Sequence, residues 1–321
     1  MTPCLFSVSY AGFWGQASLN LHDFIRHAGK LGFSSVMIAG KRPHLSPLDV
    51  TPESMAALRQ TLTDANVRCD VLAAYTNLMQ PSSIGSEVPL VEFQIAYVES
   101  LARCAAQIGA SIVRIFTAYE ADGQSLQVQW DRCCAAIREM CDRAASHGVT
   151  IAIQNHHDIA LHTDALLELL TDIDRPNCKL GFDAWSPALR GESLYDVAKK
   201  AAPHTVITTN ADYSRVPRHR YRPELVNYES VSPDWVRAVP FGQGFIDYPA
   251  FFQGLRDGGF NGLAIYEICS PIRGGGNQSN LDTCSSRYLD WMREQKDSSG
   301  NGHHLDSSGT GTCEDARTGL V

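Results

Sequence analysis

The sequence lacks the features that mark several common protein classes. It has no apolar run of about 18 residues, so no transmembrane helix is expected. Its first residues, MTPCLFSVSYAG, carry no basic segment followed by an apolar stretch and a cleavage site, so no secretion signal is expected. Positive charge is also scarce, because 27 Lys and Arg stand against 35 Asp and Glu, a net charge of -8. This balance argues against a nucleic-acid or membrane partner, and we expect a cytoplasmic protein.

Paired cysteine motifs and phosphate-binding loops are absent as well. The 10 cysteines are scattered without a CxxC pair, which argues against a structural zinc site and favours buried free thiols. The first β-rich run continues into SYAGFWGQ, which is not the GxGxxG of a dinucleotide-binding sheet. The three glycines at 274–276 lack the Lys and Ser/Thr of a P-loop. We interpret them as a flexible active-site loop.

The chain alternates short β-rich runs with amphipathic helical stretches. The expected strands are residues 5–9, 34–39, 67–74, 111–117, 150–155, 179–183, 205–210 and 263–268. Such alternation implies parallel strands with right-handed crossovers, and continuous apolar runs such as SIVRIF imply strands covered on both faces. We therefore predict an α/β fold, a single (β/α)8 TIM barrel, over residues 1–295. An open doubly wound sheet is the alternative.

Two segments fall outside this regular pattern. Residues 213–247 are predicted to form a long irregular insert between the seventh strand and the next helix. The basic stretch RVPRHRYR at 215–222 is either a solvated loop or a lid or subunit contact, so a homo-oligomer is left open. Residues 296–321 are rich in Ser, Gly and Asp and poor in apolar side chains, so we predict a disordered C-terminal tail.

Polar residues cluster at the ends of the last four predicted strands, where barrel enzymes carry their active sites. They are Gln154, Asn155, His156 and His157 after the fifth strand, Asp183 after the sixth, Thr209, Asn210 and Asp212 after the seventh, and Glu267 in the eighth. A carboxylate beside an apolar strand is costly to bury without a partner, so Asp183 and Glu267 indicate a divalent cation. Oxygen ligands favour Mn²⁺ or Mg²⁺, and an added imidazole would also admit Co²⁺ or Zn²⁺.

These strand ends resemble those of the xylose-isomerase-like barrels, a family of sugar isomerases, sugar phosphate isomerase/epimerases and related lyases. The resemblance runs from about Leu5 to Arg293 and implies a divalent metal held by Glu, Asp, His and Glu. The family's Asp and last Glu correspond to Asp183 and Glu267. Its first Glu falls on Gln154, and its His falls on Thr209, with Asn210 adjacent. We expect Gln154, Asp183, Asn210 and Glu267 to hold the metal, more weakly than the usual ligands.

The resemblance implies a metal-dependent isomerase or epimerase of a small polyhydroxylated substrate, namely a sugar, keto-sugar or sugar phosphate. The metal would acidify a C–H bond next to a carbonyl, and a base would remove that proton. Because Glu267 alone remains of the family's two Glu bases, His156 or His157 is expected to be the second acid or base. Two-residue alternation also predicts that His156 shares a strand face with Gln154. Further substrate contacts are expected from Arg114, His44, Trp185, Asp212 and Arg273.

Three other functions compete with this one. A lyase or dehydratase acting on a polyol ketone by β-elimination would use the same parts, and the mass of the product would distinguish it. A DNA-repair endonuclease on this fold needs many His ligands and a basic face, and this chain has neither. A metal-free binding protein stays open because of Gln154 and Thr209.

Overall fold

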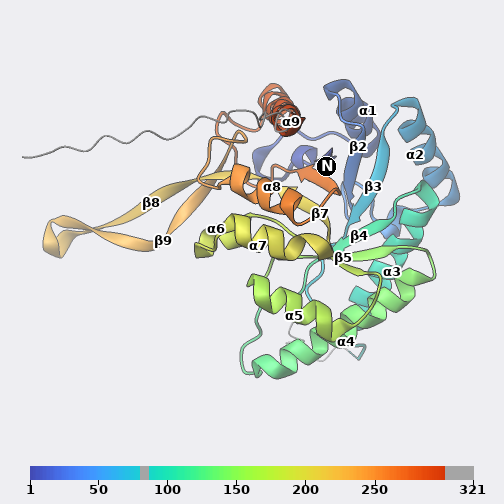
Figure 1. The fold of residues 1–321 in the computed structure, drawn as a ribbon, viewed down its shortest axis with the longest axis horizontal. Helices are drawn as coiled ribbons and strands as arrows, with labels where there is room; N and C mark the ends of the chain where they lie inside the picture. Colours follow the sequence, from blue (N-terminus) through green and yellow to red (C-terminus); the bar gives the residue numbers. More distant parts are fainter. Residues whose placement is uncertain (80–86, 301–321) are drawn as a thin grey trace, which may run out of the picture.

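Eight parallel strands form a closed barrel in the computed structural model, which describes residues 1–79 and 87–300 (Figure 1). The order around the barrel is β1-β10-β7-β6-β5-β4-β3-β2. The strands are β1 (Thr2–Phe6), β2 (Ser35–Ala39), β3 (Arg68–Ala73), β4 (Ile112–Ile115), β5 (Thr150–Gln154), β6 (Cys178–Gly181), β7 (Thr205–Asn210) and β10 (Leu263–Tyr266). The predicted (β/α)8 barrel is thus confirmed.

Helices follow the strands and cover the outside of the barrel (Figure 1). They are α1 (Leu21–Leu31), α2 (Pro52–Asp64), α3 (Leu90–Ile108), α4 (Leu126–Ala145), α5 (Thr163–Ile173), α6 (Trp185–Arg190), α7 (Leu194–Ala201), α8 (Tyr248–Asp257) and α9 (Gln278–Gly300). Gly32 and Gly109 end α1 and α3 with φ of 96° and 80°, left-handed values that a side chain would disfavour. Helix α9 continues past Lys296, where the tail was predicted to begin, and residues 301–321 lie outside the described residues.

The interior of the barrel is filled by one cluster of buried side chains. Ala152 of β5, Ile207 of β7 and Ile265 of β10 belong to this cluster. Side chains alternate along a strand, so the residues two positions later face the same interior, nearer the C-terminal end. These residues are Gln154, Thr209 and Glu267. The barrel therefore brings three of its strand-end residues onto one interior surface.

The segment predicted to be an irregular insert is instead a long antiparallel hairpin. Strands β8 (Asp212–Arg222) and β9 (Asn227–Val239) pair with each other and extend away from the barrel as an arm (Figure 1). The prediction was wrong because β8 is dense in charge and holds Pro217, and β9 holds Pro233, so the usual strand signals are weak. The base of the arm follows β7 directly and so lies at the end of the barrel that carries the site.

The described cysteines are all free, in agreement with the prediction of free thiols. Eight are buried, and Cys269 is partly exposed. Within the described ranges, no helix has the length and apolar character needed to cross a membrane.

Candidate active site

A buried amide–carboxyl pair joins the ends of β5 and β6. The Gln154 Nε2 atom donates a hydrogen bond of 2.8 Å to Asp183 Oδ2, and the backbone N–H of Trp185 donates to Oδ1 at 3.1 Å. Burial raises the pKa of Asp183 to about 7, and the nearby Glu267 carboxylate contributes to the rise, while these hydrogen bonds partly offset it. The Gln154 Oε1 atom is buried and has no hydrogen-bond partner.

Further hydrogen bonds, next to the Gln154–Asp183 pair, also join the ends of β5 and β6. Asn155 donates from Nδ2 to the Asp183 carbonyl at 3.0 Å and accepts from the Asp183 backbone N–H at 2.7 Å. The Ser186 hydroxyl donates to the Asn155 carbonyl at 2.8 Å. These bonds fix the position of Asp183, so Asn155 and Ser186 orient the carboxyl group.

Glu267 lies at the end of a short chain of polar side chains. The Cys269 thiol donates to Glu267 Oε1 at 3.4 Å, and the Tyr213 hydroxyl lies 3.0 Å from the Cys269 sulfur. Burial raises the pKa of Glu267, while Arg114 and the thiol lower it. Cys269 and Tyr213 were not among the predicted site residues. Strand alternation could not have indicated Cys269, because β10 ends at Tyr266.

The seventh strand presents Thr209 to this site, and Asn210 points the other way. Asn210 Nδ2 donates to the Ile265 carbonyl at 3.0 Å and to the Tyr288 hydroxyl of α9 at 3.2 Å, on the outer side of the strand. The expectation that Asn210 is a metal ligand is therefore corrected: its amide is engaged between the barrel and α9. Thr209 faces the interior, and its buried hydroxyl has no hydrogen-bond partner.

His156 and His157 form a pair against the aromatic residues that follow β4. Their Nδ1 atoms are 2.9 Å apart, and the Phe116 ring lies 4.9 Å and 4.5 Å from the two imidazoles. Burial lowers the pKa of each histidine to about 4, so both rings are neutral at pH 7. The alternation predicted for His156 does not apply, because β5 ends at Gln154 and His157 has a left-handed φ of 72°. The two imidazoles instead lie against Phe116, directly after β4.

A cationic group lies across the barrel mouth from the carboxyls. Arg114 of β4 is buried, and the carbon of its guanidinium lies 4.1 Å from the centre of the Phe116 ring. Lys41, two residues after β2, places its ammonium 3.7 Å from the centre of the Tyr75 ring. The barrel mouth therefore has positive charge along β2 to β4 and carboxyl groups on β6 and β10.

Trp185 lies beside this site, whereas the predicted substrate contacts His44, Asp212 and Arg273 do not. The Trp185 ring lies 4.0 Å from that of Tyr213. His44 is buried against Phe24 of α1, with Nε2 3.2 Å from the Leu19 carbonyl. The structure therefore gives His44 a packing role.

Asp212 and Arg273 are likewise engaged at the base of the arm. The Asp212 carboxylate accepts hydrogen bonds from the backbone N–H groups of Tyr213 at 2.9 Å and Gly244 at 2.7 Å. Arg273 is exposed, and its Nη2 atom lies 3.4 Å from the Ser214 hydroxyl. These two residues were predicted from their positions after strands, and the geometry gives them a role in holding the loops together.

Four oxygen-bearing side chains on neighbouring strands fit a hard cation. Gln154 Oε1 and Thr209 Oγ1 are buried without partners, and Asp183 and Glu267 are carboxyls with raised pKa. Carboxylate, amide and hydroxyl oxygens are ligands that Mg²⁺ and Mn²⁺ accept. In the described part of the chain, no three His, Cys, Asp or Glu side chains meet as a metal cluster. The oxygen set is thus suitable but carries only two charges.

A comparison of the sequence with protein-family models identifies the family of this barrel. Residues 25–295 match the family described as xylose isomerase-like TIM barrel. The chain belongs to this family. A search of curated proteins found no match to the sequence.

Solved structures of this family are similar to the chain over nearly its whole length. A xylose isomerase domain protein from Planctomyces limnophilus is 17% identical with a TM-score of 0.66, covering 94% of this chain and 98% of its own. The probable 3-DHS dehydratase AsbF from Bacillus anthracis is 17% identical with a TM-score of 0.67, covering 91% and 99%. D-allulose 3-epimerase from Methylomonas sp. is 16% identical with a TM-score of 0.68, covering 92% and 98%. At such identities the likeness establishes the fold.

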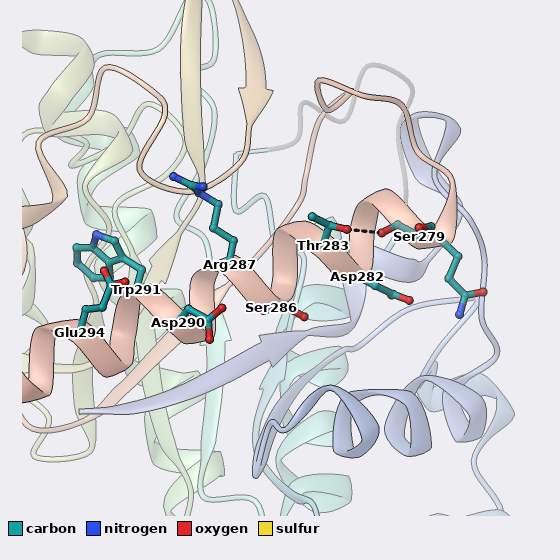
Figure 2. A pocket seen from close by; sticks show the side chains of 9 residues that line it. Ser279, Asp282, Thr283, Ser286, Arg287, Asp290, Trp291 and Glu294 are labelled. Carbon is teal, nitrogen blue, oxygen red and sulfur yellow. Dashed lines mark hydrogen bonds between the residues drawn. The ribbon is translucent and has the colours of Figure 1, made fainter.

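This member of the xylose isomerase-like family also has a groove on its outer surface. The groove has a volume of about 910 Å³ and runs along α9 (Figure 2). Every lining residue belongs to that one helix, and several are already engaged, among them Asp282 with His27 at 2.7 Å and Arg287 with the Phe241 carbonyl at 2.7 Å. No strand-end residue lines the groove, so the chemistry is assigned to the barrel mouth.

Proposed function

We propose that this xylose isomerase-like barrel is an enzyme that moves a proton next to a carbonyl in a small polyhydroxylated substrate. The single observation that supports this most is the setting of Glu267. Its carboxylate faces the barrel interior, is held by the Cys269 thiol, and lies within the electrostatic influence of both Asp183 and Arg114. A carboxylate whose pKa is raised by burial is a suitable base for such a proton. The reaction class is isomerisation or epimerisation.

We further propose that a divalent cation, with Mn²⁺ or Mg²⁺ favoured, belongs to this site. Asp183, Glu267, the Gln154 Oε1 atom and the Thr209 hydroxyl would hold it, because they supply the unpaired oxygens and the two carboxyls. When bound, the cation would polarise a substrate oxygen and acidify the neighbouring C–H bond. The neutral Gln154 and Thr209 replace charged or imidazole ligands, so the affinity is expected to be modest.

Side chains around the proposed cation have separate roles in this reaction. Glu267 accepts the proton at a carboxylate oxygen. The neutral His156 and His157 rings share one N–H in the hydrogen bond between their Nδ1 atoms, which leaves one ring N–H for a substrate oxygen, since their pKa of about 4 leaves them uncharged at pH 7. Trp185 and Tyr213, with rings 4.0 Å apart, form an apolar wall that restricts water.

A lyase is the second candidate, and the Gln154 side chain favours it. An amide cannot accept a proton, so Glu267 is the one that remains of the two Glu bases that two-sided epimerisation would use. Glu267 alone could remove one proton and return it to the β-hydroxyl, which would then leave as water. The similarity to a probable dehydratase is compatible with this chemistry.

Proton exchange in D₂O tests both candidates. The purified protein, loaded with Mn²⁺ or Mg²⁺, would be incubated with a panel of ketoses and keto acids, and deuterium at carbon would be followed by NMR. A product of unchanged mass apart from deuterium indicates isomerisation, and loss of one water indicates the lyase.

Glu267→Gln should abolish this exchange, because the amide cannot act as a base. The exposed Glu168→Gln on α5 is the control and should retain it. If the wild-type protein exchanges no carbon-bound proton with any member of the panel, or if Glu267→Gln exchanges as fast as wild type, the proposed function is wrong.

A further inference from the structure

We infer that Lys41, Arg114 and Tyr75 form a site for a substrate carboxylate, so that the substrate is a polyhydroxylated acid and not a neutral sugar. This inference rests on the proposed function for the reacting end of the molecule. It concerns a different group of side chains, on β4 and directly after β2 and β3. All three residues stand at the C-terminal end of the barrel, where the substrate would bind.

Arg114 is a buried cation that makes no ion pair among the described residues, although the Glu267 carboxylate acts on it electrostatically. Its side chain is 1% exposed, and its Nη1 atom donates to the Ala74 carbonyl at 3.0 Å, while Nε has no partner. No carboxylate forms an ion pair with it in the part of the chain that the structure describes. An unpaired buried guanidinium is costly, and protein interiors rarely retain one without a compensating group.

The aromatic rings around Arg114 surround its charge but supply no acceptor for its N–H groups. Its central carbon lies 4.1 Å from the Phe116 ring centre, 5.2 Å from that of Tyr75 and 5.7 Å from that of Phe6. Such rings stabilise the charge from their faces but cannot accept the in-plane N–H groups. A planar carboxylate matches those groups in geometry and in charge.

Lys41 and Tyr75 complete the site. The Lys41 ammonium lies 3.7 Å from the Tyr75 ring centre and 4.8 Å from that of Phe13, and no ion pair with Lys41 occurs among the described residues. Arg114 and Lys41 therefore place two positive charges around one aromatic ring. The Tyr75 hydroxyl is buried without a hydrogen-bond partner. One anion would satisfy both cations and this hydroxyl.

The site is connected to the proposed reacting groups. Burial lowers the pKa of Arg114, and the Tyr75 hydroxyl and the Glu267 carboxylate raise it, which places all three groups in one electrostatic neighbourhood. A single small molecule could thus present its carboxylate to Arg114 and a neighbouring carbon to Glu267. A phosphate is a weaker match, because the backbone N–H groups that usually bind phosphate are not part of this cluster.

Direct binding measurements test the inference without requiring turnover. Isothermal titration of the metal-loaded protein would compare D-gluconate, its neutral counterpart D-glucitol, and inorganic phosphate. Gluconate should bind at least about tenfold more tightly than glucitol, the scale of one charge-assisted contact. Equal affinities for gluconate and glucitol would overturn the inference, and so would tighter binding of phosphate than of gluconate.

Variants of Lys41 and Arg114 test whether these two residues cause the preference for gluconate. Lys41→Met should weaken gluconate binding about tenfold and leave glucitol binding unchanged, and Arg114→Gln should do the same because it removes the second positive charge. Lys30→Met, at an exposed position of α1, is the matched control and should bind like wild type. If Arg114→Gln fails to fold, Lys41→Met still decides the result, and unaltered gluconate binding by Lys41→Met refutes the site.

The two proposals fail in different ways. Selective gluconate binding without proton exchange on any substrate would contradict the proposed reaction and support the carboxylate site. Proton exchange on neutral ketoses, with no preference for acids, would support the reaction and contradict the carboxylate site.

Discussion

Replacing Asp183 by Asn should stabilise the metal-free protein while removing its metal binding. Asp183 is 3% exposed, and its pKa of about 7 compares with an ordinary value of 3.8. The two pKa values differ by about 3, and a pKa difference of one corresponds to about 1.4 kcal/mol of free energy. Charging Asp183 above pH 7 therefore costs the folded state up to about 4 kcal/mol.

The hydrogen bonds around Asp183 allow the amide of the Asp183→Asn variant to be accommodated. Its amide oxygen can take the place of Oδ1, where the backbone N–H of Trp185 already donates. Its amide nitrogen would then take the place of Oδ2 and present an N–H, which the unpaired Gln154 Oε1 atom can accept after rotation of the Gln154 amide. The rotation pairs Gln154 Oε1 and leaves Gln154 Nε2 unpaired in its place, so the number of unsatisfied Gln154 atoms does not rise.

The assay is thermal unfolding in a chelator at several pH values. The folded-state pKa of Asp183 is raised, so the wild-type protein takes up a proton on this group as pH falls through 7 and gains stability between pH 8 and pH 5. Asp183→Asn should lack this part of the gain and melt about 3–6 °C higher than wild type at pH 8. Added Mn²⁺ should raise the melting temperature of the wild type only.

The exposed Asp122→Asn is the control and should follow the wild type in both respects. If Asp183→Asn melts below the wild type at pH 8 without metal, the buried charge is compensated by something that the structure does not reveal, and the reasoning about an uncompensated carboxylate is refuted.

Three further perturbations follow from the geometry. Thr209→His should lower the Mn²⁺ dissociation constant at least about tenfold in a calorimetric titration, because an imidazole would replace a neutral hydroxyl beside Asp183; an unchanged constant would contradict the assignment of Thr209 to the site. Gly276→Ala should lower the free energy of unfolding by about 1–3 kcal/mol in urea, since its Cβ would overlap the Gly15 carbonyl oxygen; full stability would show that the loop yields easily. Replacing residues 217–234 by Asn-Gly should shift the melting temperature by less than about 3 °C, because the replaced residues pair only with each other, and a large loss would mean that the arm supports the barrel.

The barrel was predictable because its strands are apolar runs with clear ends. The seventh strand was predicted at the bounds observed for β7, and the others differ by a few residues at their ends. The arm was missed because Pro217 and a dense run of arginines hide the alternation that identifies a strand. The short helix α6 was missed since six residues carry too little periodicity to detect.

The positions of the candidate site residues at strand ends were predictable, and their individual contacts less so. Asp183, Gln154 and Glu267 follow from the rule that barrel enzymes act at the ends of their strands. Asn210 was chosen for its chemistry, whereas counting by twos from the interior Ile207 would have selected Thr209. The packing of His44 on Phe24 depends on how α1 lies across the barrel, which one sequence does not reveal.

The Asp212 carboxylate has a consequence for how this protein can change over evolution. It accepts N–H groups on both sides of the arm, from Tyr213 at the start of β8 and from Gly244 after the end of β9. The two ends of the arm are thereby tied together independently of what lies between them. Insertions or deletions at the tip can alter what the arm touches without displacing Thr209 in the preceding strand, so one barrel can acquire different neighbours.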